Sequence, residues 1–227
     1  MSAMPEAARK HFDELLEGLK AQVMEMRGLV DKMVADSVKA VVRHDYALAR
    51  QVLERDNQVD SLELEVHSTC IAIIAREAPV AKDVRFLTSA MAIAIELERV
   101  GDHAVSIAKK ALSVPGEFPS GFAAELLRMA DRVRAMLTGA LRAFATGEVS
   151  ALEEIVAADN EVDVTWKEAR RRIKEAIRQD LEMLDAGYKL IQAFHQLEYI
   201  GDNAVAIAER IEFVRTGNVV RFSRAKF

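Results

Sequence analysis

One twelve-residue stretch decides the fold, because it occurs twice: Leu97-Glu-Arg-Val-Gly-Asp-His-Ala-Val-Ser-Ile-Ala108 and Leu197-Glu-Tyr-Ile-Gly-Asp-Asn-Ala-Val-Ala-Ile-Ala208. Eight of the twelve positions are identical between the two copies. Repetition over this length indicates that the chain arose by internal duplication. The apolar residues recur at helical spacing, so each copy is expected to lie on an amphipathic helix.

Each copy carries two carboxylates four residues apart, Glu98 with Asp102 and Glu198 with Asp202. On a helix this spacing places both side chains on one face, next to the apolar stripe. Two like charges there repel by roughly 0.2–0.5 kcal/mol, and a single pair would usually be a solvated acidic flank. The repetition favours a site instead, and so does the glycine inside each copy, which lets a ligand or another backbone come close.

A second duplicated element provides further carboxylates: Asp56-Asn-Gln-Val-Asp60 matches Asp159-Asn-Glu-Val-Asp163 at four of five positions. Two helices joined by a short loop run antiparallel, so residues equally far from the turn lie at one level. The four carboxylates of the first unit are centred on Pro79, and those of the second on a point beside Asp180. Each unit is therefore expected to hold four carboxylates at one level of a helix hairpin.

Crowded carboxylates need cations, because without them their pKa values rise or the site opposes folding. Oxygen ligands favour hard ions such as magnesium, manganese, calcium or iron. Zinc is also among the divalent or trivalent ions that we expect. His103 is expected to be a polar surface residue, because its equivalent in the second copy is Asn203. The expected metal ligands are Asp56, Asp60, Glu98, Asp102, Asp159, Asp163, Glu198 and Asp202.

The composition suits long helices: 51% of the 227 residues are hydrophobic, and there are only ten glycines and four prolines. The net charge of −5 argues against a nucleic-acid partner. Cys70 is the only cysteine, so it is expected in the core rather than in a disulfide. The sequence shows neither a signal peptide nor an apolar run of membrane-spanning length, so a cytoplasmic protein without membrane insertion is expected.

The periodicity predicts an all-α protein built from two tandem three-helix bundles related by duplication. The first repeat is assigned to residues 1–113, a linker to 114–120, the second repeat to 121–216, and a loosely held basic tail to 217–227. Breaks in the apolar pattern and the positions of proline and glycine set the helix ends. The predicted helices span residues 8–43, 46–77, 80–112, 122–146, 149–179 and 182–215.

These motifs resemble those of the PhoU family, regulators associated with bacterial phosphate uptake. The resemblance covers residues 10–217 and lies in the repeated Leu-Glu-Arg-Ile-Gly-Asp-His-Ala type motif together with the paired carboxylates. It implies two similar three-helix bundles in an elongated protein, with metal clusters on the bundle surface held by the eight carboxylates above. Tyr199 and Asn203 depart from the family pattern, which affects the outer shell of the second site. Asp83-Val-Arg85 resembles a family Asp-Leu-Arg element just after the helix turn.

The resemblance also implies a function. The family suggests a negative regulator of the phosphate-starvation response, an adaptor and not an enzyme. It would couple the ATPase subunit of the phosphate ABC transporter to a phosphate-sensing histidine kinase, control phosphate uptake and act as a homodimer.

Two alternatives stay open. A di-metal carboxylate enzyme is one, but such bundles use Glu-x-x-His ligand pairs, and no glutamate here has a histidine three residues later. A metal-free helical scaffold is the other, and it would carry no stoichiometric metal.

Overall fold

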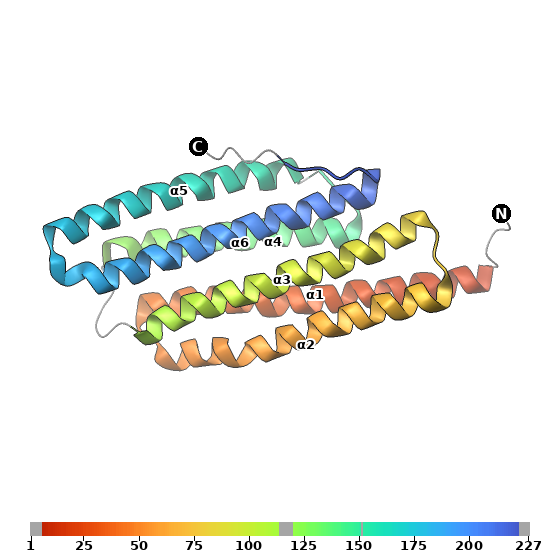
Figure 1. Ribbon diagram of the computed structural model, residues 1–227, viewed down its shortest axis with the longest axis horizontal. Coiled ribbons are helices and arrows are strands. Elements are labelled where there is room, and N and C mark those ends of the chain that lie inside the picture. Colours follow the sequence, from red (N-terminus) through yellow and green to blue (C-terminus); the bar gives the residue numbers. More distant parts are fainter. Residues whose placement is uncertain (1–5, 114–119, 151, 223–227) are drawn as a thin grey trace.

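A computed structural model describes residues 6–113, 120–150 and 152–222, and it is all-helical there (Figure 1). The six predicted helices are confirmed, with ends within three residues of the predicted ones. The predicted linker lies, except for Ser120, outside the described residues, so the division into repeats stays a prediction. The helices are α1 (Glu6–Arg43), α2 (Tyr46–Glu77), α3 (Ala81–Ser113), α4 (Ala123–Thr146), α5 (Leu152–Gln179) and α6 (Leu184–Thr216), with short 3-10 turns at Ser120–Phe122 and Leu181–Met183.

Local chemistry explains where the helices end. Asp45 caps α2, because its carboxylate accepts a hydrogen bond from the Leu48 backbone N–H at 2.9 Å. Ala78 adopts a left-handed conformation after α2 and precedes a proline, so the helix cannot continue. The helix α6 begins two residues later than predicted, because residues Leu181–Met183 form a 3-10 turn in which the Glu182 backbone N–H donates to the Asp180 carboxylate at 3.0 Å.

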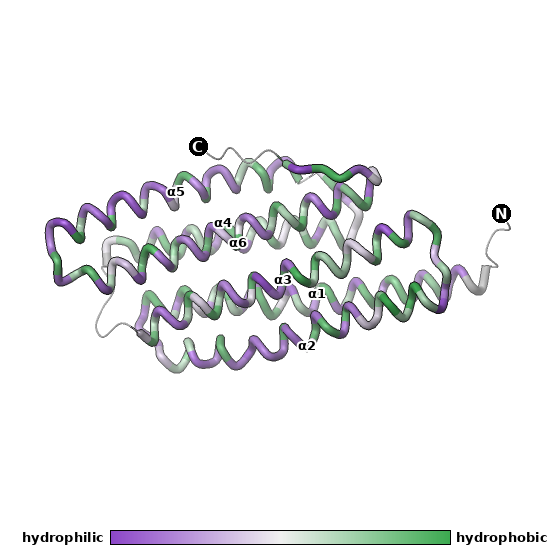
Figure 2. The backbone as a smooth tube through the Cα atoms, in the orientation of Figure 1, coloured by the Kyte–Doolittle hydropathy of each residue, from purple (hydrophilic) through white to green (hydrophobic). Residues whose placement is uncertain are grey.

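The two bundles lie side by side rather than end to end (Figure 1). α1, α2 and α3 pack on one another, and so do α4, α5 and α6. Between the bundles, α3 packs against α6 and α1 against α4, so each helix of these pairs meets its own equivalent in the other repeat. Figure 2 shows apolar residues along the inner faces of the helices, which form one continuous core.

The repeated motif lies in that core as predicted. Leu97 and Leu197, and Ile107 and Ile207, are fully buried in equivalent places of the two bundles. Cys70 is also fully buried, and burial raises the pKa of its thiol to about 12, so its assignment to the core is confirmed. No helix in the described part of the chain combines the length and apolar character needed to cross a membrane.

Hydrogen bonds between α3 and α6 show how the repeats are related. His103 Nδ1 lies 2.8 Å from Gln196 Oε1, and the Asn203 side-chain amide donates to Glu96 Oε2 at 2.7 Å. His103 and Asn203 are equivalent residues, and so are Glu96 and Gln196, so an approximate twofold axis relates the two bonds. The prediction that His103 is a surface residue is wrong, since it is partly buried between the repeats and stacks on Tyr199.

A contact between α1 and α4 lies on the same approximate axis. The Arg134 guanidinium donates through Nε and Nη2 to the two carboxylate oxygens of Asp31, both at 2.9 Å. Asp31 and Arg134 occupy equivalent positions, since the segments beginning at Val30 and Val133 align. The two halves therefore meet through matching surfaces.

The tail is held more firmly than predicted, at least up to Phe222. Glu209 on α6 is 5% exposed, and it accepts hydrogen bonds from the Phe222 backbone N–H at 2.9 Å and from Arg221 Nη1 at 2.8 Å. Since a buried carboxylate needs such partners, the first residues of the tail belong to the folded structure.

Candidate carboxylate metal centres

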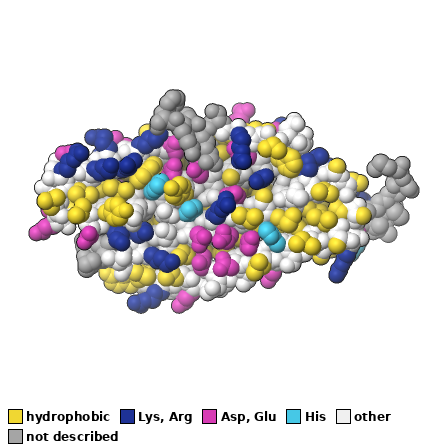
Figure 3. All heavy atoms as spheres, in the orientation of Figure 1, with side chains coloured by type: hydrophobic (Ala, Val, Ile, Leu, Met, Phe, Trp, Pro, Cys, Tyr) yellow, Lys and Arg dark blue, Asp and Glu magenta, His cyan; other side chains and the backbone are white. Residues whose placement is uncertain are grey.

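The first cluster lies between α2 and α3 and includes all four carboxylates predicted for the first unit. Figure 3 shows acidic side chains gathered over the middle of these two helices. The carboxylate of Glu98 interacts with Asp60 and Asp102, and Asp56 interacts with the same two residues. The sequence therefore placed these four side chains at the correct level and on facing sides of the hairpin.

Burial and mutual repulsion shift the acidity of this cluster. Burial raises the pKa of Glu98 to about 7, and the charges of Asp102, Asp60 and Glu63 and a hydrogen bond to Asp102 act in the same direction. The pKa of Asp56 is also raised, first by burial and then by Asp60 and Asp102. The cluster therefore carries more negative charge than its surroundings compensate, which is the condition that a bound cation would relieve.

The glycine of the repeated motif explains why the helices come so close at this level. A Cβ atom at Gly101 would lie 3.4 Å from Val59 Cγ1 and 3.6 Å from Asp56 Oδ1. The Asp56 carboxylate thus lies over the α3 backbone. In the second unit, a Cβ at Gly201 would lie only 3.0 Å from Asp159 Oδ1, so the duplicated glycine serves the same approach.

The second set of carboxylates lies on α5 and α6, the helices equivalent to α2 and α3, but different side chains surround it. Asp159 is 8% exposed and lies over Gly201. Asp163 Oδ2 lies 3.8 Å from Lys167 Nζ on its own helix. Glu198 Oε2 lies 3.8 Å from His195 Nε2, and that imidazole ring stacks on Trp166.

Asp202, the fourth carboxylate of the second unit, also lines a hollow between the repeats. This hollow, of about 540 Å³, includes Tyr199 and Asn203, which therefore border the contact between α3 and α6. The two departures from the family pattern thus take part in the packing of the repeats, through the contacts of Asn203 with Glu96 and of Tyr199 with His103. Their effect on an outer shell of the second site stays a prediction.

The chemistry of these residues suits a metal ion, but their present arrangement does not surround one. The donor set is oxygen-rich and its charge favours a hard cation. Among the described residues, however, no three histidine, cysteine, aspartate or glutamate side chains converge as they would around one ion. The carboxylates of a cluster would have to rotate towards a common point to coordinate a metal.

Sequence reasoning missed Glu63, which adds to the repulsion on Glu98. Its Oε1 atom lies 3.6 Å from His67 Nε2 on the same helix. Glu63 could not be found through the duplication, because the equivalent position in the second unit is Trp166. Its position three residues after Asp60, on the same helix face, is the signal that could have revealed it.

Comparisons with known proteins agree with this architecture. A family model described as the PhoU domain matches residues 23–111 and again residues 126–211. The phosphate-specific transport system accessory protein PhoU homolog of Pseudomonas putida is 34% identical over 214 residues, covering 93% of this chain and 83% of that protein. The homolog named in the same words from Rhizobium meliloti is 33% identical, covering 95% of this chain and 91% of its own length.

Two solved structures share the fold. The crystal structure of PhoU from Pseudomonas aeruginosa superimposes with a TM-score of 0.86 at 33% identity, covering 91% of this chain and 100% of that one. The phosphate transport system regulatory protein PhoU from Streptococcus pneumoniae gives 0.85 at 25% identity, covering 93% and 100%. With two PhoU domains side by side, a duplicated carboxylate motif on α3 and α6, and relatives matched over most of their length, the chain belongs to the PhoU family.

Proposed function

We propose that this chain is an accessory protein of phosphate uptake and a negative regulator of the phosphate-starvation response. In this role it works in the cytoplasm as a homodimer, without entering the membrane or binding nucleic acid. It couples the ATPase subunit of the phosphate ABC transporter to a phosphate-sensing histidine kinase. Family membership supports the link to phosphate transport, and the relatives' names describe accessory proteins, which supports an adaptor rather than an enzyme.

The observation that carries the proposal is the duplicated carboxylate cluster. In each unit an aspartate, Asp56 or Asp159, lies over the glycine of the repeated motif. The first cluster has charges that a cation would neutralise. We propose that iron, magnesium, manganese or zinc binds there and either braces the hairpin or bridges to an anionic group on a partner protein.

Metal content is the first measurement. We would purify the wild type without chelators or a histidine tag, beside Asp102→Ala and Asp202→Ala, and determine metals by elemental analysis. Glu65→Ala, an exposed glutamate on α2, is the matched control. Metal in the wild type that is lowered by each site variant, and unchanged in the control, would support one site in each unit.

Regulation needs a second experiment. A strain lacking the gene, complemented with wild type or with the two variants, would be tested for repression of a phosphate-starvation reporter in high phosphate. Capture of the transporter ATPase subunit and of the histidine kinase would be measured in the same strains. A folded wild type without metal that still represses the reporter would remove the metal from the mechanism, and failure of wild type to restore repression would overturn the regulatory role.

A further inference from the structure

A cavity of about 440 Å³ lies at one end of the contact between the two repeats. The first turn of α3 and part of α1 form one side, and the last turns of α4 and α6 form the other. Its lining includes none of the eight predicted metal ligands. The proposed adaptor function therefore leaves this cavity unexplained.

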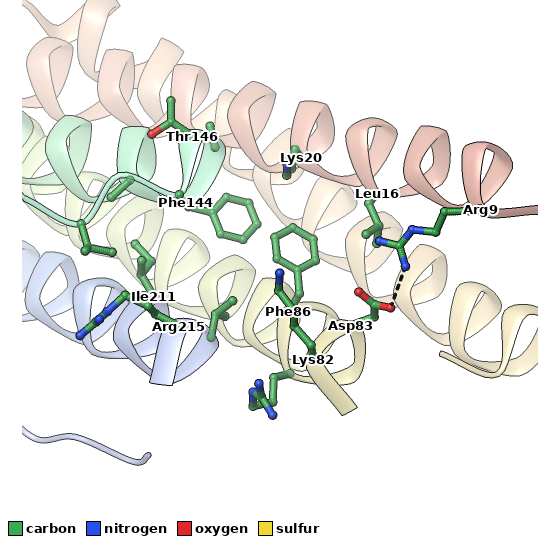
Figure 4. A pocket seen from close by; sticks show the side chains of 16 residues that line it. Arg9, Leu16, Lys20, Lys82, Asp83, Phe86, Phe144, Thr146, Ile211 and Arg215 are labelled. Carbon is green, nitrogen blue, oxygen red and sulfur yellow. Dashed lines mark ion pairs between the residues drawn. The ribbon is translucent and has the colours of Figure 1, made fainter. Parts of the chain in front are cut away.

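The lining is strongly basic. Among the described residues it contains one carboxylate, Asp83, which is mostly buried and lies 3.5 Å from Arg9 Nη1 (Figure 4). Three of the basic side chains that line the cavity, Arg9, Lys20 and Arg215, also form an ion pair with a carboxylate on their own helix. The basic lining residues are Arg9, Lys20, Lys82, Arg85 and Arg215.

Lys82 and Arg85 differ from the other three cations. Within the described ranges, neither side chain has an ion-pair or hydrogen-bond partner, and the Nε atom of Arg85 is buried without an acceptor. The two residues are three apart in the first turns of α3, so they lie on one side of the helix. A buried donor without an acceptor is unfavourable, so an acceptor from outside the chain would account for it.

The backbone nearby makes room for the Arg85 guanidinium. Gly217 ends α6 with φ +75°, a conformation that favours glycine, and a Cβ atom there would lie 3.6 Å from Arg85 Cζ. The guanidinium therefore lies against the last turn of α6 on one side and lines the cavity on the other.

Apart from Thr146, the side chains of the remaining walls are apolar. The rings of Phe86 and Phe144 stack at 5.1 Å between centroids with an interplanar angle of 4°, and they join α3 to α4. Figure 4 shows these two rings facing each other in the middle of the pocket, with Lys20 beside them. Leu16 and Ile211 add further apolar surface from α1 and α6.

We propose that this cavity binds an organic phosphate, a compound that joins a phosphate group to a flat aromatic ring as a nucleoside monophosphate does. The phosphate group would bind Lys82 and Arg85 at the N-terminus of α3, where the helix dipole also favours an anion. Arginine presents paired N–H donors that match phosphate oxygens. The aromatic ring of the ligand would lie against the phenylalanine wall, in a volume typical of small-molecule sites. This inference goes beyond the proposed function and does not depend on it.

The test is isothermal titration of the full-length protein with adenosine monophosphate, adenosine and inorganic phosphate. We expect adenosine monophosphate to bind, and the other two probes to bind at least about tenfold more weakly, because each lacks one half of the recognised ligand. Arg85→Gln and Lys82→Gln should each weaken binding of the nucleotide by at least about tenfold. Lys174→Gln, which makes the same charge change at an exposed position on α5, should leave binding unchanged.

Lys82 is exposed, so its variant keeps the test valid if Arg85→Gln fails to fold. Circular dichroism would confirm the fold of each variant. Absence of nucleotide binding at millimolar concentration would overturn the proposal. Equal affinity for inorganic phosphate and the nucleotide would overturn the claim that the ligand is an organic phosphate. Nucleotide binding that both variants leave unchanged would overturn the claim that Lys82 and Arg85 form its site.

Discussion

Replacing Glu98 by glutamine should remove a pH-dependent loss of stability from the metal-free protein. The pKa of Glu98 is raised from 4.5 to about 7 in the folded chain, because burial and neighbouring carboxylates disfavour its charged form. The folded state therefore holds this proton more tightly than the unfolded state. The stabilisation is complete below about pH 4.5 and is lost as the pH rises through about 7.

The size of this effect follows from the difference between the two pKa values. That difference corresponds to at most about 3 kcal/mol in the free energy of unfolding. Because solvent reaches much of this side chain and screens the repulsion, we expect about 1–2 kcal/mol. Asp56, whose pKa is raised for the same reasons, changes stability in the same direction.

Urea titrations at pH 5.5 and pH 8.0 in the presence of a chelator would measure the effect. Between these pH values, the wild type should lose about 1–2 kcal/mol more than Glu98→Gln, which cannot ionise at this position. Glu65→Gln, on the exposed side of α2, should behave as the wild type does. Equal losses in wild type and Glu98→Gln would refute the argument that burial and the neighbouring carboxylates raise the pKa of Glu98.

Adding manganese extends the same experiment to the proposed metal. Carboxylates must be deprotonated to bind a metal, so the stabilisation by manganese should increase from pH 5.5 to pH 8.0. A concentration one hundred times the dissociation constant would add about 2.7 kcal/mol. Stabilisation that does not grow with pH would show that manganese acts elsewhere on the protein.

Three further predictions concern packing and the contacts that hold the molecule together. Gly187→Ala should lower the free energy of unfolding by about 1–2 kcal/mol in a urea titration, since its new Cβ would lie 2.8 Å from an isoleucine side chain on α5, outweighing the gain in helix propensity. A double-mutant cycle of Asp31→Asn and Arg134→Gln should give a coupling energy of about 1 kcal/mol, because their paired hydrogen bonds are only partly shielded from water. Removing residues 218–227 should destabilise the fold by about 2–3 kcal/mol, because buried Glu209 loses both of its partners, and Glu209→Gln should recover part of that loss in thermal unfolding.

Each of these predictions has a contrasting result. Gly18→Ala, where no atom lies within 4 Å of the new Cβ, should stabilise the protein by up to about 1 kcal/mol, so equal effects at both glycines would exclude the steric explanation. A coupling energy of zero would mean that the Asp31 pair does not help to join the repeats. A truncated chain as stable as the full one would show that water satisfies Glu209.

The helices and the first carboxylate cluster were predictable from the sequence for physical reasons. The apolar period marks the buried face of each helix, and proline and capping residues mark its ends. The levels of Asp56 and Asp102 followed from their equal distance to the turn at Pro79. The duplication indicated which carboxylates to group, because a single pair four residues apart is usually a solvated flank, whereas the same pair in both repeats favours a site.

What the sequence did not predict depends on which helices cover one another. The helical period identifies the apolar face of α3 but not that α6 covers it, so the burial of His103 between the repeats was missed. Glu63 escaped because only one repeat carries it. The basic cavity was also missed, because residues of α1, α3, α4 and α6 meet there only after the bundles have packed side by side.

The approximate twofold contact between α3 and α6 has a consequence for how this protein can change over time. In a dimer of two identical chains, a residue pair on such an axis appears twice, and one substitution alters both copies at once. Here both halves belong to one polypeptide, so one copy of the pair is His103 with Gln196 and the other is Glu96 with Asn203. Because the two halves are separate stretches of one chain, a substitution in one half leaves the equivalent residue of the other half unchanged. The covalent connection also makes the meeting of the halves a unimolecular step, which keeps the contact intact however dilute the protein becomes.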